Sequence, residues 1–185
     1  MSDRVGQLLV ATPELADPNF ARTVTLIISS DEEGVVGLTL NRPTEMTLEQ
    51  AWEESAMGPV CERGGRLFAG GPCPGPLMAL HRESEYADGE VLDGLYFSSD
   101  PDALIGLLSR DDPRPLRCYV GYAGWDRHQL AAEIETSSWL LARTSAEEVL
   151  ADEPVDWLEV LERIEPSLAR LHRHPALVPD DPSCN

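Results

Sequence analysis

The sequence predicts an α+β fold with a mostly antiparallel sheet, and three observations support this class. Segments of alternating or β-branched apolar residues follow one another at short intervals in the N-terminal part. Strong turn signals, such as Asp31-Glu32-Glu33-Gly34, return the chain directly into the next of these segments. The strict alternation of strands and helices that is typical of a doubly wound parallel sheet is missing. Hairpins with helices between them are therefore expected.

The N-terminal part reads as an antiparallel meander. Gly6–Ala11 and Thr23–Ser29 are predicted strands, and Asp17-Pro18 places a loop between them. Val35–Leu40 is the expected hairpin partner of the second strand. Pro43 has no amide donor and is expected to end this strand pairing.

The middle of the chain mixes helices and strands. A helix is predicted from Thr47, because Gln50 follows it at the spacing of a capping box, and it ends before Gly58-Pro59. The other elements expected in this region are strands at Arg66–Ala69, Pro76–His81 and Val91–Ser98 and a helix after Asp100.

The stretch from residue 117 to residue 130 carries the densest signal. A short apolar strand runs into Gly121 and Gly124, and a helix is expected to begin close to Asp126. Two interpretations stand. The glycine-bearing turn and the free N–H groups of the helix start could form an anion site. Alternatively, the glycines only permit a tight crossing from strand to helix while the aromatic side chains of the turn fill the core.

The C-terminal part adds a strand, two helical signals and a tail. A late strand is predicted at Ser138–Ala142, and Ser145 with Glu148 repeats the capping-box spacing. The apolar residues of 157–164 recur at helical spacing. Prolines and aspartates predict a flexible tail over residues 172–185, and because no linker interrupts the rest, residues 1–171 are expected to form a single domain.

Three motifs carry a resemblance to a known family. Gly37-Leu38-Thr39-Leu40-Asn41-Arg42-Pro43, Gly70-Gly71-Pro72 and Gly121-Tyr122-Ala123-Gly124-Trp125 resemble, in this order, motifs of the AlgH/YqgE family of bacterial proteins. Gly6–Ala11 and Trp139 extend the resemblance over a whole domain. The resemblance implies a bent, bifurcated sheet that closes into a pseudo-barrel with flanking helices. It also implies a regulatory role, which is proposed for one branch of the family.

Composition and charge limit the classes of partner. With 42% hydrophobic residues and a mean hydropathy of -0.23, the chain has an ordinary globular composition, and no apolar run approaches the ~20 residues that span a bilayer. Residues 1–4 lead into a strand without the features of a secretory signal, so a cytoplasmic location and no membrane partner are expected. A net charge of -19 argues against direct binding of nucleic acid. Two explanations of this charge remain: the protein binds a basic partner protein, or it comes from an organism whose proteins are generally acidic.

Common catalytic motifs are missing from the sequence. There is no Gly-x-Ser-x-Gly elbow, no phosphate-binding loop, no dinucleotide fingerprint and no His-Glu-x-x-His pair. No catalytic residue, cofactor or metal is therefore expected, and the pattern favours a protein that is not an enzyme. The 4 cysteines fall at irregular spacings, and Cys73, between Pro72 and Pro74, is the candidate for a redox-sensitive thiol.

The three family motifs also supply the candidate ligand-binding site, because each is expected at a strand end, where pockets tend to form. Arg42 could offer a bidentate fork, the glycines approachable amides, and Tyr122 or Trp125 a stacking face. The alternative is a structural turn in which Arg42 pairs with a surface carboxylate. The candidate residues are Asn41, Arg42, Gly70, Gly71, Gly121, Tyr122, Gly124 and Trp125.

Three functional hypotheses follow from these features. The leading hypothesis is a non-catalytic regulatory or adaptor protein with an unidentified protein partner. The alternative is a small-molecule sensor or enzyme that takes a small anionic ligand near Arg42 and Gly121–Trp125. The third hypothesis is redox sensing through Cys73.

Overall fold

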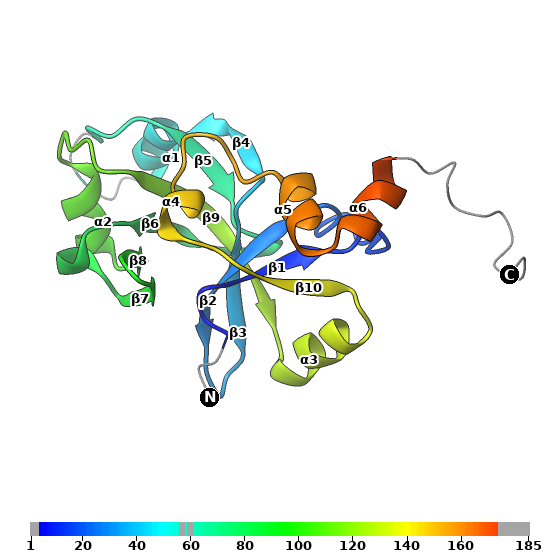
Figure 1. Cartoon of the computed structure of the whole chain (residues 1–185). Coiled ribbons are helices and arrows are strands. Elements are labelled where there is room, and N and C mark those ends of the chain that lie inside the picture. The colour runs from blue at the N-terminus through cyan, green and yellow to red at the C-terminus, as the bar shows by residue number, and fades with distance from the viewer. Residues whose placement is uncertain (1–3, 56–57, 59–60, 174–185) are drawn as a thin grey trace, which may run out of the picture.

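The computed structural model describes residues 4–55, 58 and 61–173, and this part of the chain forms ten strands and six α-helices (Figure 1). The strands are β1 (Gln7–Ala11), β2 (Val24–Ser30), β3 (Val35–Thr39), β4 (Pro43–Thr47), β5 (Arg66–Ala69), β6 (Cys73–His81), β7 (Gly89–Leu92), β8 (Leu95–Ser98), β9 (Leu116–Trp125) and β10 (Trp139–Arg143). The helices are α1 (Leu48–Ser55), α2 (Pro101–Leu108), α3 (Arg127–Glu135), α4 (Ala146–Val149), α5 (Trp157–Ile164) and α6 (Pro166–Arg173), with a 3-10 turn η1 (Ser84–Tyr86).

The strands form one curled, mostly antiparallel sheet. Their order is β10-β1-β2-β3-β9-β6-β8-β7, with β4 and β5 branching beside β9, and β5 is the strand that runs parallel to its neighbour β9. The far end of the sheet bends back toward its beginning, because a Cβ on Gly6 would lie 2.7 Å from the carbonyl oxygen of Val91 on β7. The sheet is therefore a half-barrel with flanking helices, which confirms the predicted α+β class and its bent sheet.

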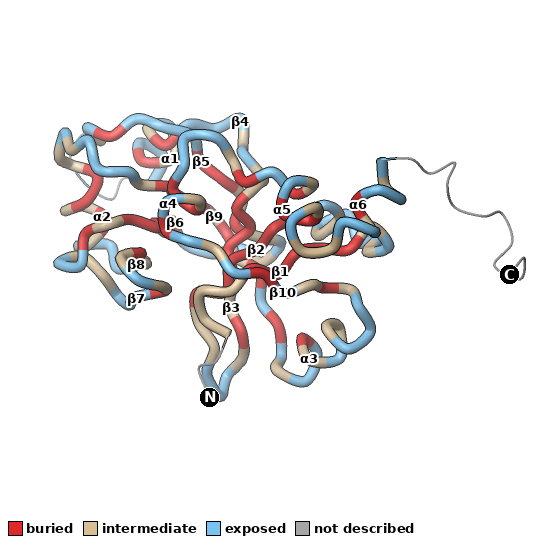
Figure 2. Tube along the Cα trace, viewed as in Figure 1, coloured by how far each residue is buried: buried red, intermediate tan, exposed pale blue. Residues whose placement is uncertain are grey.

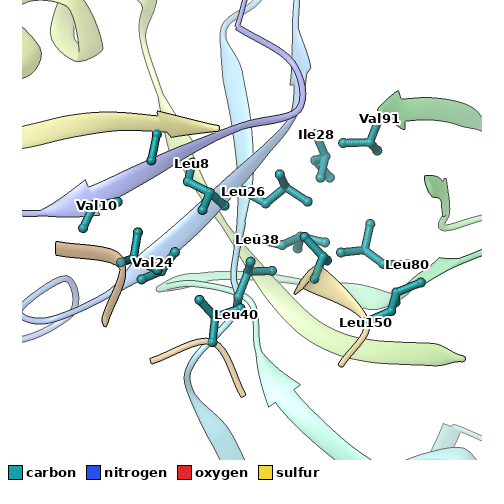
Figure 3. Packing of buried hydrophobic residues seen from close by; sticks show 14 of the residues in the cluster. Leu8, Val10, Val24, Leu26, Ile28, Leu38, Leu40, Leu80, Val91 and Leu150 are labelled. Carbon is teal, nitrogen blue, oxygen red and sulfur yellow. The ribbon is translucent and has the colours of Figure 1, made fainter. Parts of the chain in front are cut away.

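The concave side of the sheet encloses the largest group of buried side chains (Figure 3). Leu8, Leu26 and Leu38 converge there from β1, β2 and β3, and the buried residues follow the central strands while the loops are exposed (Figure 2). Three helices cover this core from one side, with Val149 on α4, Leu161 on α5 and Ala169 on α6.

Two smaller cores lie on the other face of the sheet. Leu9 and Leu8 are neighbours on β1 but belong to different cores, as the two-residue period of a strand requires. Helix α3 covers one of these cores with Leu130, and helices α1 and α2 cover the other with Trp52 and Leu104. In Figure 1, α1 and α2 lie at the end of the sheet opposite to α5 and α6.

Strand β9 is shared by the two halves of the sheet, and here one prediction is wrong. The glycines were expected to end a short strand, yet β9 continues through them to Trp125. Residues 118–120 pair with β5, and residues 123–125 pair with β3. Gly121 has a φ of 69°, a left-handed conformation that glycine adopts without steric cost, so the strand bends between its two sets of partners instead of ending. The predicted helix start is confirmed, since Asp126 caps α3.

Three other expectations are corrected by the structure. Residues 91–98 form two strands, because Gly94 has a φ of 66° and turns β7 back into β8. Pro43 begins β4 instead of ending the pairing, and the first position of a strand can lack an amide donor. His172 and Arg173 belong to α6, so the helix runs past the expected start of the tail, and residues 174–185 lie outside the described part.

Candidate functional site

The three family motifs meet at the point where the sheet divides. The amide of Ala69 donates to the carbonyl of Arg42 over 2.8 Å, and the amide of Gly70 donates to Val120 over 2.8 Å. The carbonyl of Gly70 accepts from Thr39, also at 2.8 Å. Segments that are distant in sequence thus share one junction, but the backbone groups of Gly70 bond to neighbouring strands and are not available to a ligand.

The glycines are required at this junction for a steric reason. A Cβ on Gly70 would lie 2.2 Å from the carbonyl oxygen of Gly121, and one on Gly71 would lie 2.2 Å from the carbonyl carbon of Tyr122. A Cβ on Gly121 would in turn lie 2.7 Å from the carbonyl oxygen of Cys73. Because these are backbone atoms of packed strands, they cannot move aside. The motif glycines let two backbones cross in direct contact.

Trp125 is a core residue and not an open stacking face. Its ring is buried and stacks on Phe20 with centroids 5.6 Å apart, while Trp139 meets it edge-on at 5.8 Å. The indole N–H of Trp125 donates to Glu133 over 3.1 Å, and the indole N–H of Trp139 donates to the same carboxylate oxygen over 2.8 Å. Of the two interpretations of residues 117–130, the one in which the aromatic side chains fill the core therefore holds for Trp125.

Tyr122, Gly124 and Cys73 lie together at the surface of the junction. Tyr122 is half-buried, and its ring lies 3.2 Å from where a Cβ on Gly124 would be. Gly124 is exposed and pairs with Val36 of β3. Cys73 is half-buried and pairs with Tyr122 at the start of β6. Its redox role stays a prediction.

The side chains of Asn41 and Arg42 hold the loop around Arg22 in place through hydrogen bonds to its backbone. The side-chain oxygen of Asn41 accepts from the amide of Val24 at 3.0 Å, and its nitrogen donates to the carbonyl of Arg22 at 2.9 Å. The Arg42 guanidinium donates to the carbonyl of Ala21 at 2.6 Å, where a surface carboxylate had been the alternative. Arg22 itself has a φ of 58°, which is uncommon for a residue with a side chain. Both motif side chains thus fasten the backbone around Arg22.

An open groove of about 500 Å³ lies beside this loop. It runs between the start of β4 and the helices α5 and α6, and the guanidinium of Arg22 has no ion pair within the described residues. Its lining contains no serine, threonine, cysteine or lysine that could form a covalent intermediate. The lining residues are Arg22, Asn41, Pro43, Pro154, Val155, Asp156, Trp157, Leu158 and His172.

A second polar cluster lies near α2, and sequence reasoning missed it. The buried carboxylate of Glu83 accepts from Arg110 at 2.5 Å and from Arg114 at 2.8 Å, with Arg63 3.5 Å away. Asp112 bonds to Arg114 at 2.6 Å, and this bond holds the pKa of Asp112 well below its usual range. Every carboxylate in the cluster faces an arginine, so none is available as a general base.

His81 is fully buried next to this cluster. Its Nδ1 accepts from the amide of Glu83 at 3.1 Å, so the proton of the neutral ring lies on Nε2 and is shared with Ser98 at 2.8 Å. Ser98 in turn donates to the carbonyl of Tyr86. Burial, with a smaller contribution from Arg63, lowers the pKa of His81 to about 4. The hydroxyl and the imidazole lie together, but neither reaches solvent where a substrate could bind.

The described residues contain no group of three or more His, Cys, Asp or Glu side chains arranged to hold a metal ion. None of the helices within these ranges is long and apolar enough to cross a lipid bilayer. Of the residues that line the groove, Asn41 was a predicted site residue, whereas Arg22 and the others were missed by sequence reasoning. The sequence neighbours of Arg22 carry no motif, and only coordinates show that two distant side chains fix its backbone.

Comparison with known proteins gives a consistent family. A family model described as AlgH-like matches residues 8–169. A UPF0301 protein of Myxococcus xanthus is 41% identical over 157 residues, which covers 83% of this chain and 86% of that protein, and one of Streptomyces avermitilis is 35% identical over 100% of this chain and 97% of its own length.

Two solved structures are similar to this chain. The solution structure of the AlgH protein from Pseudomonas aeruginosa superposes with a TM-score of 0.71 at 28% identity and covers 85% of this chain and 86% of its own. A crystal structure of a Corynebacterium diphtheriae protein superposes with a TM-score of 0.67 at 26% identity and covers 89% of each chain. Their backbones therefore follow the same path over most of the described domain.

Proposed function

The chain belongs to the AlgH-like family, and from this premise we propose that it is a non-catalytic regulatory or adaptor protein that acts in the bacterial cytoplasm by binding a partner. The observation that carries this proposal is the open groove lined by Arg22 and helices α5 and α6, which has polar and apolar walls but no serine, threonine, cysteine or lysine. The buried carboxylate of Glu83 is already bonded to Arg110 and Arg114 and is not available to a substrate. These features support recognition without chemical conversion.

A second candidate is a sensor of small molecules. A groove of about 500 Å³ falls within the ~300 to 1,000 Å³ that is typical of small-molecule sites, so the size supports this candidate as well. In both cases the groove, rather than the junction at Gly121–Trp125, is the surface that meets the ligand.

Site-specific photo-crosslinking in growing cells tests the proposal. A photoreactive side chain at Leu158, which lines the groove, is expected to form a reproducible adduct. The same side chain at Leu141, an exposed leucine of β10 outside the groove lining, is the matched control and is expected to form none. The His172→Trp substitution fills the groove and should remove the adduct at Leu158.

The mass of the adduct separates the candidates. A protein adduct supports an adaptor and a small molecule supports a sensor, provided that the partner is recovered chemically unchanged. A bound molecule that is converted during incubation would instead indicate an enzyme. If Leu158 and Leu141 give the same adducts, or if Leu158 gives none, the groove is not the binding surface and the proposal fails.

A further inference from the structure

We propose that Arg22 is the anion-binding subsite of the groove, and that the groove takes a small organic anion with an apolar body. This inference rests on the proposed function in its second form, the small-molecule sensor, because it names the chemical class of ligand for the same groove. It depends on three features of the described residues: the backbone of Arg22, the charge around its guanidinium, and the walls of the groove.

The backbone conformation of Arg22 is strained and is held in place by its neighbours. An arginine at a φ of 58° has its Cβ close to the following carbonyl, a conformation that glycine or asparagine would adopt more readily. Asn41 donates to the carbonyl of Arg22, Arg42 donates to that of Ala21, and the Thr23 hydroxyl donates to Phe20 over 2.7 Å. Strain that is held by several bonds is characteristic of functional positions.

Among the described residues the guanidinium of Arg22 has no carboxylate partner, although the full sequence has 33 acidic and 14 basic residues. No ion pair or hydrogen bond engages it within the described residues. The acidic residue of the groove lining is Asp156, which caps α5 by accepting from the amide of Glu159 at 2.9 Å. His172 also lines the groove. An anion would therefore find an unengaged bidentate donor at Arg22.

Five of the nine lining residues are apolar, and they can contact a body attached to that anion. Trp157 donates its indole N–H to the carbonyl of Ala11 over 2.7 Å, so its polar group is already satisfied inside the protein. The ring of His172 meets Trp157 edge-on with centroids 4.9 Å apart. A compact polyanion would meet one arginine and the repulsion of Asp156, whereas a single anionic group on an apolar body matches both kinds of wall. The apolar lining residues are Pro43, Pro154, Val155, Trp157 and Leu158.

Two probes that differ by one anionic group test this inference on the full chain. Anilinonaphthalene sulfonate carries a sulfonate, and N-phenylnaphthylamine has the same aromatic body without it. The Arg22→Ala substitution is expected to raise the Kd of the sulfonate probe roughly 10-fold and to leave that of the neutral probe unchanged. The Arg66→Ala variant, which removes an exposed arginine outside the groove, should bind both probes like the wild type.

A second variant separates binding from folding. Arg22→Gly removes the charge and also relieves the strained φ. It should therefore weaken binding of the sulfonate probe as much as Arg22→Ala does, while raising the melting temperature of the protein. Chemical shift changes on adding the sulfonate probe should include the amides of Arg22, Asn41 and Leu158.

Each failure has its own meaning. Equal binding of the sulfonate probe by wild type and Arg22→Ala would overturn the inference, while a groove adduct at Leu158 would leave the proposed function intact. Binding of neither probe, or shift changes confined to other surfaces, would overturn it as well. An Arg22→Gly variant that melts lower than wild type would contradict the strain on which the argument depends.

Discussion

Glu133 connects two tryptophans and a helix through one carboxylate. Its Oε2 accepts from the indoles of Trp125 and Trp139, and its Oε1 accepts from Gln129 over 2.7 Å. Both indole rings are buried, so without Glu133 their N–H groups would lack an acceptor. The side chain thus fixes α3 against β9 and β10.

We expect Glu133→Ala to lower the free energy of unfolding by roughly 2 to 4 kcal/mol, because two buried donors lose their partner. Urea unfolding followed by tryptophan fluorescence measures this directly, since both affected residues are fluorophores. Glu135→Ala, at an exposed position of the same helix, is the control and should change stability by less than about 0.5 kcal/mol. Equal effects of the two substitutions would contradict the role assigned to Glu133.

His81 makes stability depend on pH. Its pKa is about 4 in the folded protein and 6.5 when unperturbed, so between these values the unfolded chain binds the proton more strongly. Stability is therefore complete above pH 6.5 and falls as the pH drops toward 4, by at most about 3 kcal/mol from the shift in pKa. Arg82 lowers the pKa of Glu147 from 4.5 to about 2, so Glu147 affects stability at a lower pH than His81 does.

Urea unfolding between pH 4.5 and 8 tests this prediction. Wild type should lose stability steadily below pH 6.5, and His81→Gln, although less stable overall, should show a flatter profile in that range. A variant whose stability falls with pH as steeply as that of wild type would show that other groups cause the pH dependence.

At the scale of elements, the division of the sheet depends on the crossing of β5, β6 and β9. The glycines allow these backbones to contact each other at distances that leave no room for a side chain, and Gly121 bends β9 between its partners. The Cβ of an alanine at position 71 would lie 2.2 Å from Tyr122 and 2.3 Å from Ala123, on backbone atoms in both cases.

Gly71→Ala is therefore expected to destabilise the fold by roughly 3 kcal/mol or more, since strands must separate to admit the methyl group. Gly89→Ala is the matched control, because a Cβ there has no atom within 4 Å, and it should be neutral or slightly stabilising. Thermal unfolding of the two variants measures the difference. A folded Gly71→Ala protein with wild-type stability would show that the crossing is looser than these distances indicate.

Local sequence patterns predicted many helices and strands, but they failed where residues that are distant in the sequence determine the structure. Thr47 and Gln50 form the predicted capping box, with the Thr47 amide donating to Gln50 at 2.9 Å, because a helix start is determined within one turn. The continuation of β9 past Gly121 depends on β3, which lies far away in the sequence. Likewise, the sequence placed each motif at a strand end, but the partners of the Asn41 and Arg42 side chains in the loop around Arg22 depend on tertiary structure and were not predictable.

At the scale of the whole molecule, charge is the dominant surface property. A net charge of -19 on a 20.3 kDa chain repels polyanions over distances of about a Debye length, near 8 Å at physiological salt. The three arginines around Glu83 are paired with acidic side chains and add no basic surface for phosphates.

We expect no complex with duplex DNA or RNA at about 0.15 M salt, with any Kd weaker than roughly 10⁻⁴ M, because the chain lacks the basic footprint that releases counterions. Gel mobility or fluorescence anisotropy with a labelled duplex measures this, with a basic DNA-binding protein as positive control. A complex that weakens steeply with added salt would contradict the expectation.

The pairing of β1 with β10 has a consequence for synthesis of the protein in the cell. Gln7 lies opposite Arg143, and Ala11 accepts a bond from Trp157, so the first strand acquires its outer neighbour only after most of the chain has left the ribosome. During translation its open edge is exposed to other nascent chains for several seconds at ordinary elongation rates of ~5 to 20 residues per second. Folding of this domain is therefore completed from its C-terminal end, and truncated products will present an adhesive strand that quality-control factors can recognise.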